Sequence, residues 1–376
     1  MTDAGWVDAR GAGSVEPARS VALAASLARG LSGERRRRLV LVGLGVAVLG
    51  CAAANLALGA MHVPLARVLA ALLEPFGVPV PALGVEERAV VLAIRLPRVL
   101  LGLSVGAALG VSGALMQGLF RNPLADPTLI GVSSGAALGA KTVIVLGTQL
   151  GASLAGDWAL PLCAFLGALA VTWLVWGLSR RDGRTDVTTL LLAGIAINAL
   201  AMALQGLLAL IASDAQLRTL TFWMLGSLGG ATFQSVGLSA PGVALVIVAA
   251  PFFAGSLNAL LLGEGDARCL GVDVERLKRV AIVLTAVAVG SAVAFCGNIA
   301  FVGLLAPHLL RLAFGPDHRL LLPGAALLGA VLISLSDLVS RTLLAPQEIP
   351  LGILTATLGA PFFLWLLRRR RLIGGL

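Results

Sequence analysis

The sequence has 376 residues, of which 58% are hydrophobic and only 12% are charged, and its mean hydropathy is +0.96. This balance excludes a water-soluble globular protein, in which roughly 25% of residues are charged. The formal net charge of +9 does not indicate nucleic-acid binding, because no soluble basic domain carries it.

The first 33 residues mix acidic side chains and arginines with small residues, and they contain no uninterrupted apolar core. This composition predicts a mostly disordered cytoplasmic N-terminal tail (1–33) rather than a signal peptide. Residues 34–376 are expected to form one transmembrane domain.

Long apolar runs recur along that domain, each near the roughly 20 residues that an α-helix needs to cross a bilayer. They predict an all-α, polytopic membrane protein with ten transmembrane helices. The predicted spans are 39–60, 98–119, 127–147, 159–178, 187–211, 236–256, 279–296, 299–314, 320–338 and 350–367.

Most of the basic residues cluster in alternate links between these spans. With both termini in the cytoplasm, the clusters at 35–38, 180–184, 268–279 and 368–371 all lie inside, as cytoplasmic Lys and Arg residues should. The basic residues that this orientation places outside are Arg67, Arg88, Arg95, Arg98, Lys141, Arg218 and Arg341.

Arg95 and Arg98 begin the second span and Arg341 ends the ninth, so topology alone does not require them. Three residues apart on a helix, Arg95 and Arg98 are expected to point the same way. One interpretation is that they snorkel to the lipid headgroups. The other is an external docking patch for acidic side chains, since arginine forms bidentate pairs with carboxylates.

Glycines recur at small-residue spacing inside two predicted spans, at Gly102, Gly106, Gly110 and Gly113, and at Gly131, Gly135 and Gly139. Such stripes allow the backbones of membrane helices to approach closely. They predict helix-packing faces rather than ligand sites.

Few ionisable side chains fall inside the predicted spans, whereas an ion-coupled transporter needs such groups to bind its ion. The sequence contains no Ser-His-Asp triad, carboxylate pair or HExxH motif, so no catalytic residues are predicted. The four cysteines are far apart and the three histidines lie near span ends or loops, so no metal site is predicted.

Residues 257–271, "LNALLLGEGDARCLG", form a short amphipathic segment on the predicted cytoplasmic side, with Gly263 and Gly271 as expected breaks. The segment fits either a helix on the membrane surface or a helix that sits in a groove of a cytoplasmic partner.

Together with this segment, several ordered motifs resemble the permease subunits of bacterial ATP-binding cassette (ABC) importers for iron-siderophores, haem and cobalamin. The resemblance covers about residues 39–370. Its other motifs are "RLPR" at 95–98, "SGALMQGLFRNPLADPTLIGVSSGA" at 112–136, "IAFVGLLAPHLLR" at 299–311, "DHRLLLPG" at 317–324 and "IPLGILTATLGAPFFLWLL" at 349–367.

The resemblance implies a type II ABC importer permease fold in the bacterial inner membrane. It implies a homodimer around a translocation path, two cytoplasmic ATPase subunits that hold ATP-Mg, and a periplasmic solute-binding protein. This chain would bind no cofactor itself. The implied roles fall on docking residues Arg95, Arg98 and Arg341, coupling residues Leu262, Gly263, Glu264, Ala267 and Gly271, and cytoplasmic gate residues Asn122, Leu124 and Thr188.

The segment "LRTLTFWMLGSLGGATF" at 217–233 resembles the haem branch of this family most closely, so haem is the expected cargo. Cobalamin and a ferric siderophore remain alternatives within the same class. A transporter driven by an ion gradient and a channel-like protein without a pump partner are the alternatives from other classes.

Overall fold

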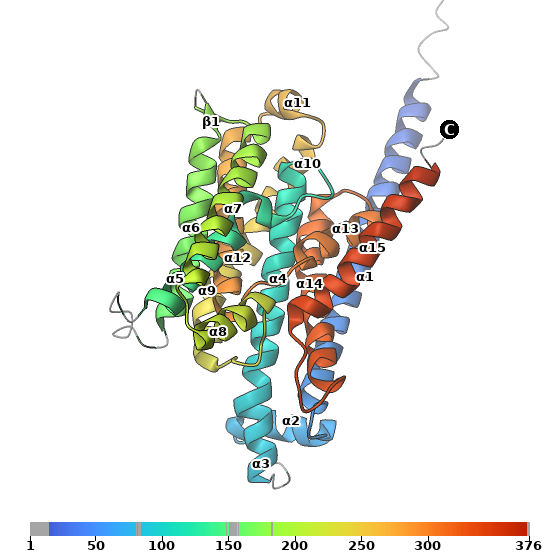
Figure 1. Cartoon of the computed structure of the whole chain (residues 1–376). Coiled ribbons are helices and arrows are strands. Elements are labelled where there is room, and N and C mark those ends of the chain that lie inside the picture. The colour runs from blue at the N-terminus through green and yellow to red at the C-terminus, as the bar shows by residue number, and fades with distance from the viewer. Residues whose placement is uncertain are drawn as a thin grey trace, which may run out of the picture. The chain divides into compact units, whose positions relative to one another are not determined.

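The computed structural model describes residues 15–79, 81, 84–147, 149, 156, 158–181 and 183–373. The chain divides into two compact units, Met1–Gly43 and Leu44–Leu376. All of the sites below lie in the second unit, and Figure 1 labels its helices.

Among the described residues the secondary structure is almost entirely helical, as the sequence predicts. The helices are α1 (Val15–Ala57), α2 (Leu65–Leu73), η1 (Glu74–Phe76), α3 (Val85–Arg88), η2 (Ala89–Arg95), α4 (Leu96–Leu119), η3 (Pro127–Ile130), α5 (Val132–Leu146), α6 (Ala159–Leu178), α7 (Val187–Leu210), α8 (Asp214–Leu225), α9 (Phe233–Ala249), η5 (Ala250–Phe253), α10 (Ala254–Leu260), α11 (Glu264–Cys269), α12 (Val274–Cys296), α13 (Val302–Phe314), α14 (His318–Thr342) and α15 (Leu351–Ile373). A two-stranded antiparallel hairpin, β1 (Arg180–Arg181) and β2 (Arg184–Thr185), joins α6 to α7.

Seven helical stretches among the described residues are long and apolar enough to cross a membrane, and three shorter apolar helices accompany them. Each of the ten predicted spans coincides with one of these stretches. The shorter helices are Val132–Leu146, Val302–Phe314 and Leu351–Trp365. The fold is therefore multi-pass and all-helical, while the number of membrane crossings stays a prediction.

The predicted tail differs from the structure in part. Helix α1 starts at Val15 and so covers residues that the sequence analysis assigns to a disordered segment, whereas residues 1–14 lie outside the described part. The alanine, leucine and arginine content of residues 15–33 explains the helix, because these are strong helix formers.

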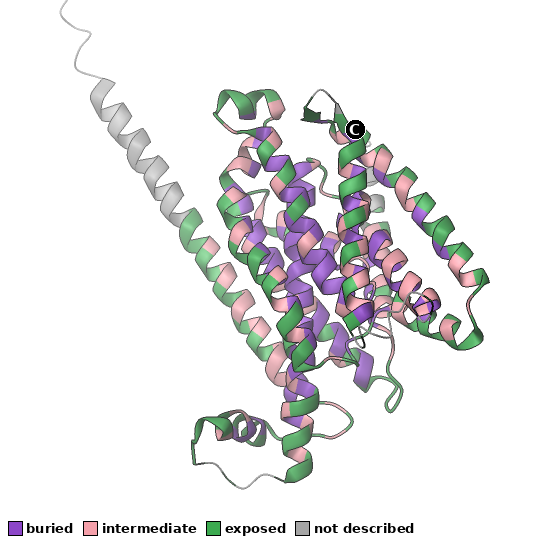
Figure 2. Ribbon diagram, turned by 90° about the vertical axis from the view of Figure 1, so that its left-hand side faces the viewer, coloured by how far each residue is buried: buried purple, intermediate pink, exposed green. Residues whose placement is uncertain are grey.

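Helix α4 lies at the centre of the second unit (Figure 1), and it packs against α14, α12, α13 and α9. In its apolar stretch 83% of residues are buried, against 17% in α7. Figure 2 shows this contrast as a purple interior flanked by helices with green outer faces. The exposed faces of α7 are apolar, which suits contact with lipid or with another protein.

Glycines allow the close packing around α4, as the sequence predicts. A Cβ atom built on Gly110 would lie 1.9 Å from the carbonyl oxygen of Ala325, and one on Gly113 would lie 1.6 Å from that of Gly303. The second stripe behaves likewise, since a Cβ on Gly135 would lie 2.3 Å from the carbonyl oxygen of Gly167 in α6. Glycine is therefore required at these helix crossings.

The ends of the unit agree with the predicted sidedness. The basic hairpin and α11 lie at one end, and α2 and α3 lie at the opposite end (Figure 1). Segments that the sequence places on the same side of the membrane are thus found together. The first end is called the coupling end below and the second the docking end.

Candidate functional site

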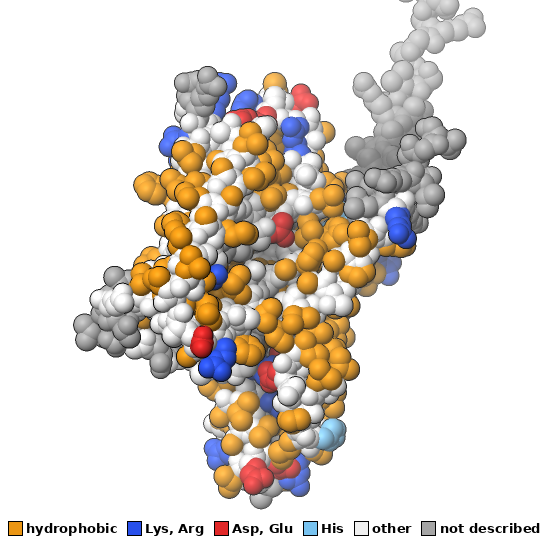
Figure 3. Space-filling model, viewed as in Figure 1, with side chains coloured by type: hydrophobic (Ala, Val, Ile, Leu, Met, Phe, Trp, Pro, Cys, Tyr) orange, Lys and Arg blue, Asp and Glu red, His pale blue; other side chains and the backbone are white. Residues whose placement is uncertain are grey.

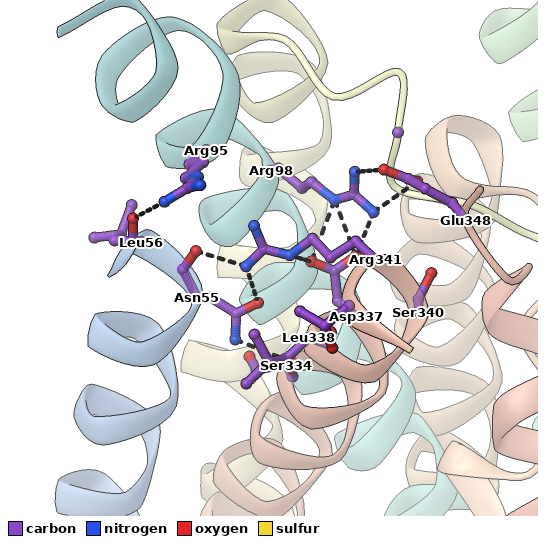
Figure 4. A network of polar contacts seen from close by, with 12 residues as sticks. Asn55, Leu56, Arg95, Arg98, Ser334, Asp337, Leu338, Ser340, Arg341 and Glu348 are labelled. Carbon is purple, nitrogen blue, oxygen red and sulfur yellow. Dashed lines mark hydrogen bonds and ion pairs between the residues drawn. The ribbon is translucent and has the colours of Figure 1, made fainter. Parts of the chain in front are cut away.

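The three predicted docking arginines meet at the docking end of the unit, where η2, α4 and α14 come together (Figure 4). They are not exposed: 4% of Arg95, 7% of Arg98 and 9% of Arg341 is accessible. In this chain the three side chains therefore face neither solvent nor lipid headgroups, and their docking role stays a prediction. The reason is that the chain itself supplies carboxylates and carbonyl oxygens to all three guanidinium groups.

Arg98 holds two carboxylates at once. Its Nε donates to Oδ1 and Oδ2 of Asp337 at 2.9 and 3.2 Å. Its Nη1 and Nη2 donate to Oε1 and Oε2 of Glu348 at 2.7 and 2.9 Å. The second contact is a parallel, bidentate fork, the strongest geometry available to an arginine and a carboxylate.

Arg341 joins Asp337 to the end of α1. Its Nε lies 3.5 Å from Oδ2 of Asp337, and its Nη2 donates to the backbone oxygen of Asn55 and, at 2.8 Å, to Oδ1 of Asn55. The amide of Asn55 then donates to the backbone oxygen of Ser334 at 3.0 Å. These contacts connect α1 with α14.

Arg95 turns away from Arg98, although the two residues are three positions apart. It donates to the backbone oxygens of Leu56, Ala57 and Met61, at 2.7 Å for the first. The expected shared direction is not observed: η2 is a π-helical turn that continues directly into α4, and a π-helical turn changes the angular spacing of side chains from that of an α-helix. Arg95 therefore neutralises the negative end of the α1 dipole.

The network combines three arginines with two carboxylates and the carbonyl end of a helix. The hydrogen bonds from Arg98 hold the pKa of Glu348 below its usual value. Removing one member of such a network leaves its partner charged and buried, which costs more than the net contribution of the pair. The Arg95, Arg98, Arg341, Asp337 and Glu348 side chains, together with Asn55, are called the docking-end network below.

Asp337 and Glu348 were not predicted as site residues. A sequence signal exists for Asp337, since it is an acidic residue inside an apolar span, one helical turn before Arg341. No comparable signal marks Glu348, which lies in a loop and is 250 positions from its partner Arg98.

At the coupling end, α10 and α11 form two short helices separated by Gly263, at the predicted break. Gly263 has φ of +123° and Gly271 has φ of +82°, so both positions favour glycine. Ala267 is fully buried, whereas Leu262 is exposed at the turn between the two helices. The segment thus presents apolar surface beside a fixed turn.

Glu264 is tied to the body of the protein by a lysine that the sequence analysis did not select. Nζ of Lys278 lies 2.8 Å from Oε1 of Glu264 and donates to the backbone oxygen of Thr185 at 2.7 Å. Because Lys278 is buried in α12, it links α11 with the basic hairpin.

Asn258 provides a second link from α10 to the membrane helices. Its amide donates to Oδ1 of Asp317 at 2.6 Å, and its own oxygen accepts from the backbone N–H of His318 at 2.8 Å. A displacement of α10 would therefore be transmitted to the first turn of α14.

The predicted gate residues are all exposed at the surface of this unit. Asn122 and Leu124 share one turn after α4, in which Oδ1 of Asn122 accepts from the Leu124 backbone at 2.9 Å. Thr188 lies in the first turn of α7, next to the N-cap Asp186. Within the described residues no hydrogen bond joins Thr188 to the other two, so their gating role stays a prediction.

Two cavities share Trp223 and Phe295 as walls. The larger, of about 660 Å³, lies between the ends of α5, α6, α9 and α12. The smaller, of about 430 Å³, is also lined by Arg218 and Phe222 of α8. Arg218 is exposed, and among the described residues no ion pair involves it.

Residues 46–369 match the FecCD transport family. This chain belongs to that family. It is a multi-pass ABC importer permease, a non-catalytic type of subunit.

The chain is 49% identical over 280 residues to the hemin transport system permease protein HmuU of Yersinia pestis, which covers 74% of this chain and 83% of that protein. It is 42% identical over 312 residues to the cobalamin import system permease protein BtuC of Halobacterium salinarum, covering 78% and 80% of the two chains. The solved structure of an inward-facing metal-chelate type ABC transporter matches with a TM-score of 0.76 and 32% identity, over 88% of this chain and 99% of that one.

Proposed function

We propose that this FecCD permease carries haem across the bacterial inner membrane. In the proposed assembly two copies pair around the path, two cytoplasmic ATPase subunits hold ATP-Mg, and a periplasmic binding protein delivers the haem. Each copy would cross the membrane ten times, with both termini in the cytoplasm. The identity of 49% to a hemin permease is the observation that carries this proposal.

The cavity between α8 and α12 supports haem as the cargo. Its walls include Phe222, Trp223 and Phe295, and Arg218 also lines it. Haem is flat and largely apolar and bears two carboxylates, so aromatic faces and one arginine complement it. Cobalamin is the second candidate, because a cobalamin permease is 42% identical.

The proposal predicts selective uptake into sealed proteoliposomes that contain the permease and its ATPase. Haem, offered with its binding protein, should accumulate in an ATP-dependent manner, whereas cobalamin and a ferric siderophore with their own binding proteins should not. Phe222→Ser should lower haem uptake about two- to fivefold, because one aromatic contact is lost. The control Phe252→Ser changes an exposed phenylalanine of η5 and should leave uptake unchanged. If cobalamin alone accumulated, the cargo would be cobalamin and not haem.

Two kinds of surface support the proposed partners. The apolar face of α7, which carries exposed Leu192, Ile195 and Leu207, is suited to a second copy or to lipid. Leu262, at the turn between α10 and α11, and Leu270, at the end of α11, are both exposed and suit a groove on an ATPase subunit.

The coupling role of α11 gives a separate prediction. Gly263→Val should reduce transport at least about tenfold and leave the rate of ATP hydrolysis unchanged. The reason is that a side chain at φ of +123° displaces the turn that would contact the ATPase. Gly265→Ala is the matched control, since a Cβ there meets no atom within 4 Å. Measuring ATP hydrolysis and haem uptake in the same vesicles checks the ratio of the two rates. If the ratio of haem uptake to ATP hydrolysis were the same in Gly263→Val and Gly265→Ala, Gly263 would have no coupling role.

A further inference from the structure

The side chain of Glu348 binds Arg98, the arginine that a docking protein would need. Both of its carboxylate oxygens bind the terminal nitrogens of Arg98, at 2.7 and 2.9 Å. Only 8% of the Arg98 side chain is accessible while this contact exists. An external carboxylate therefore cannot form a bidentate pair with Arg98 unless Glu348 first leaves.

The two carboxylates around Arg98 differ in a way that makes one of them replaceable. Asp337 has only 4% of its side chain accessible and contacts both Arg98 and Arg341. Glu348 is 40% accessible, and among the described residues its side chain forms hydrogen bonds and an ion pair with Arg98 alone. If Glu348 moved out, Asp337 would still hold Nε and Nη2 of Arg98, the latter at 2.8 Å, so that Nη1 would lose its carboxylate and Nη2 would keep one of two (Figure 4).

We propose that Glu348 is a positioning residue that holds Arg98 in the undocked permease and is displaced by a carboxylate of the incoming solute-binding protein. The inference rests on the proposed function, since it needs such a partner. In this exchange one arginine–carboxylate fork replaces another, so no charge is left buried and unpaired at the end. The affinity of docking is then the difference between two similar contacts.

Release of Glu348 would also affect the loop that leads into α15. The neighbouring Ile349 is held by α14, because its N–H donates to the Ser340 backbone at 3.0 Å and its oxygen accepts from the Ser340 hydroxyl at 2.6 Å. Two residues further on, the N–H of Leu351 donates to the oxygen of Gly226, at the end of α8. The loop that carries Glu348 thus connects the docking surface with α8 and α15.

The test measures binding of the solute-binding protein to the permease–ATPase complex in nanodiscs. Glu348→Gln should tighten binding about fivefold at low salt, since it removes the competing contact and keeps the side-chain shape. Glu348→Asp keeps the charge but shortens the reach, and it should give a smaller increase. Amide exchange of Ile349 should rise in Glu348→Gln, and docking should produce the same rise in the wild type.

Glu87→Gln is the matched control. It removes a carboxylate that pairs with Arg67 and not with any member of the docking-end network. The change in net charge is therefore the same as in Glu348→Gln. Equal tightening in Glu87→Gln and Glu348→Gln, or no tightening in Glu348→Gln, would overturn the inference. A different variant tests the docking role itself. If Arg98 had no such role, Arg98→Ala would bind the solute-binding protein as well as the wild type does.

Discussion

Replacing Asp337 by alanine is expected to destabilise the folded permease by about 3–5 kcal/mol, because it leaves Arg98 and Arg341 buried without their shared carboxylate. The loss should show as a lower midpoint in SDS-titrated or thermal unfolding of the purified protein. Among single substitutions in the docking-end network we expect this one to have the largest effect, since Asp337 is its most buried carboxylate.

Glu86→Gln serves as the control for that experiment. Glu86 is exposed in α3 and forms no ion pair among the described residues, so the variant should unfold within about 0.5 kcal/mol of the wild type. The double variant with Asp337→Ala and Arg341→Met should regain part of the lost stability, because one unpaired charge is removed as well. An Asp337→Ala protein as stable as the Glu86→Gln control would show that the network does not stabilise the fold.

Gly113→Ala is expected to disrupt the packing of α4 and to cost at least about 3 kcal/mol. The added Cβ would lie 1.6 Å from the backbone oxygen of Gly303, and a backbone atom, unlike the end of a flexible side chain, cannot move aside locally. Size-exclusion profiles and unfolding midpoints of the purified variant measure the effect.

Gly177→Ala is the matched control, because Gly177 lies in helix α6 and a Cβ there meets no atom within 4 Å. This variant should be as stable as the wild type or more stable by up to about 1 kcal/mol, since alanine favours a helix. Similar losses in both variants would mean that the close contact at Gly113 is not the cause of the lost stability.

The apolar helices could be predicted from the sequence because span length and hydropathy are local properties of the chain. The ten predicted runs coincide with ten apolar helices, and the glycine stripes and the breaks at Gly263 and Gly271 were also predicted correctly. The helical start at Val15 was missed, since the charged composition of that segment suggested disorder although its helix propensity is high.

The candidate sites were predicted unevenly. Residues of the coupling segment could be selected because they adjoin one another in sequence, whereas their anchors Lys278 and Asn258 act through contacts with distant elements. The family resemblance assigned a docking role to Arg95, Arg98 and Arg341, and that role stays a proposal. It gave no indication that the three side chains are already paired.

By itself, the sequence determined that this protein is a bundle of apolar helices with one basic end, because those properties depend on composition. It also determined the family, because the family is marked by short motifs in a fixed order. The tertiary structure alone decided where the charges of the three arginines are balanced. Asp337 and Glu348 lie 239 and 250 positions from Arg98, and only the packing of α14 and its following loop against α4 brings them within hydrogen-bonding distance. Electrostatic pairing depends on distance in space, which local patterns along the chain do not contain.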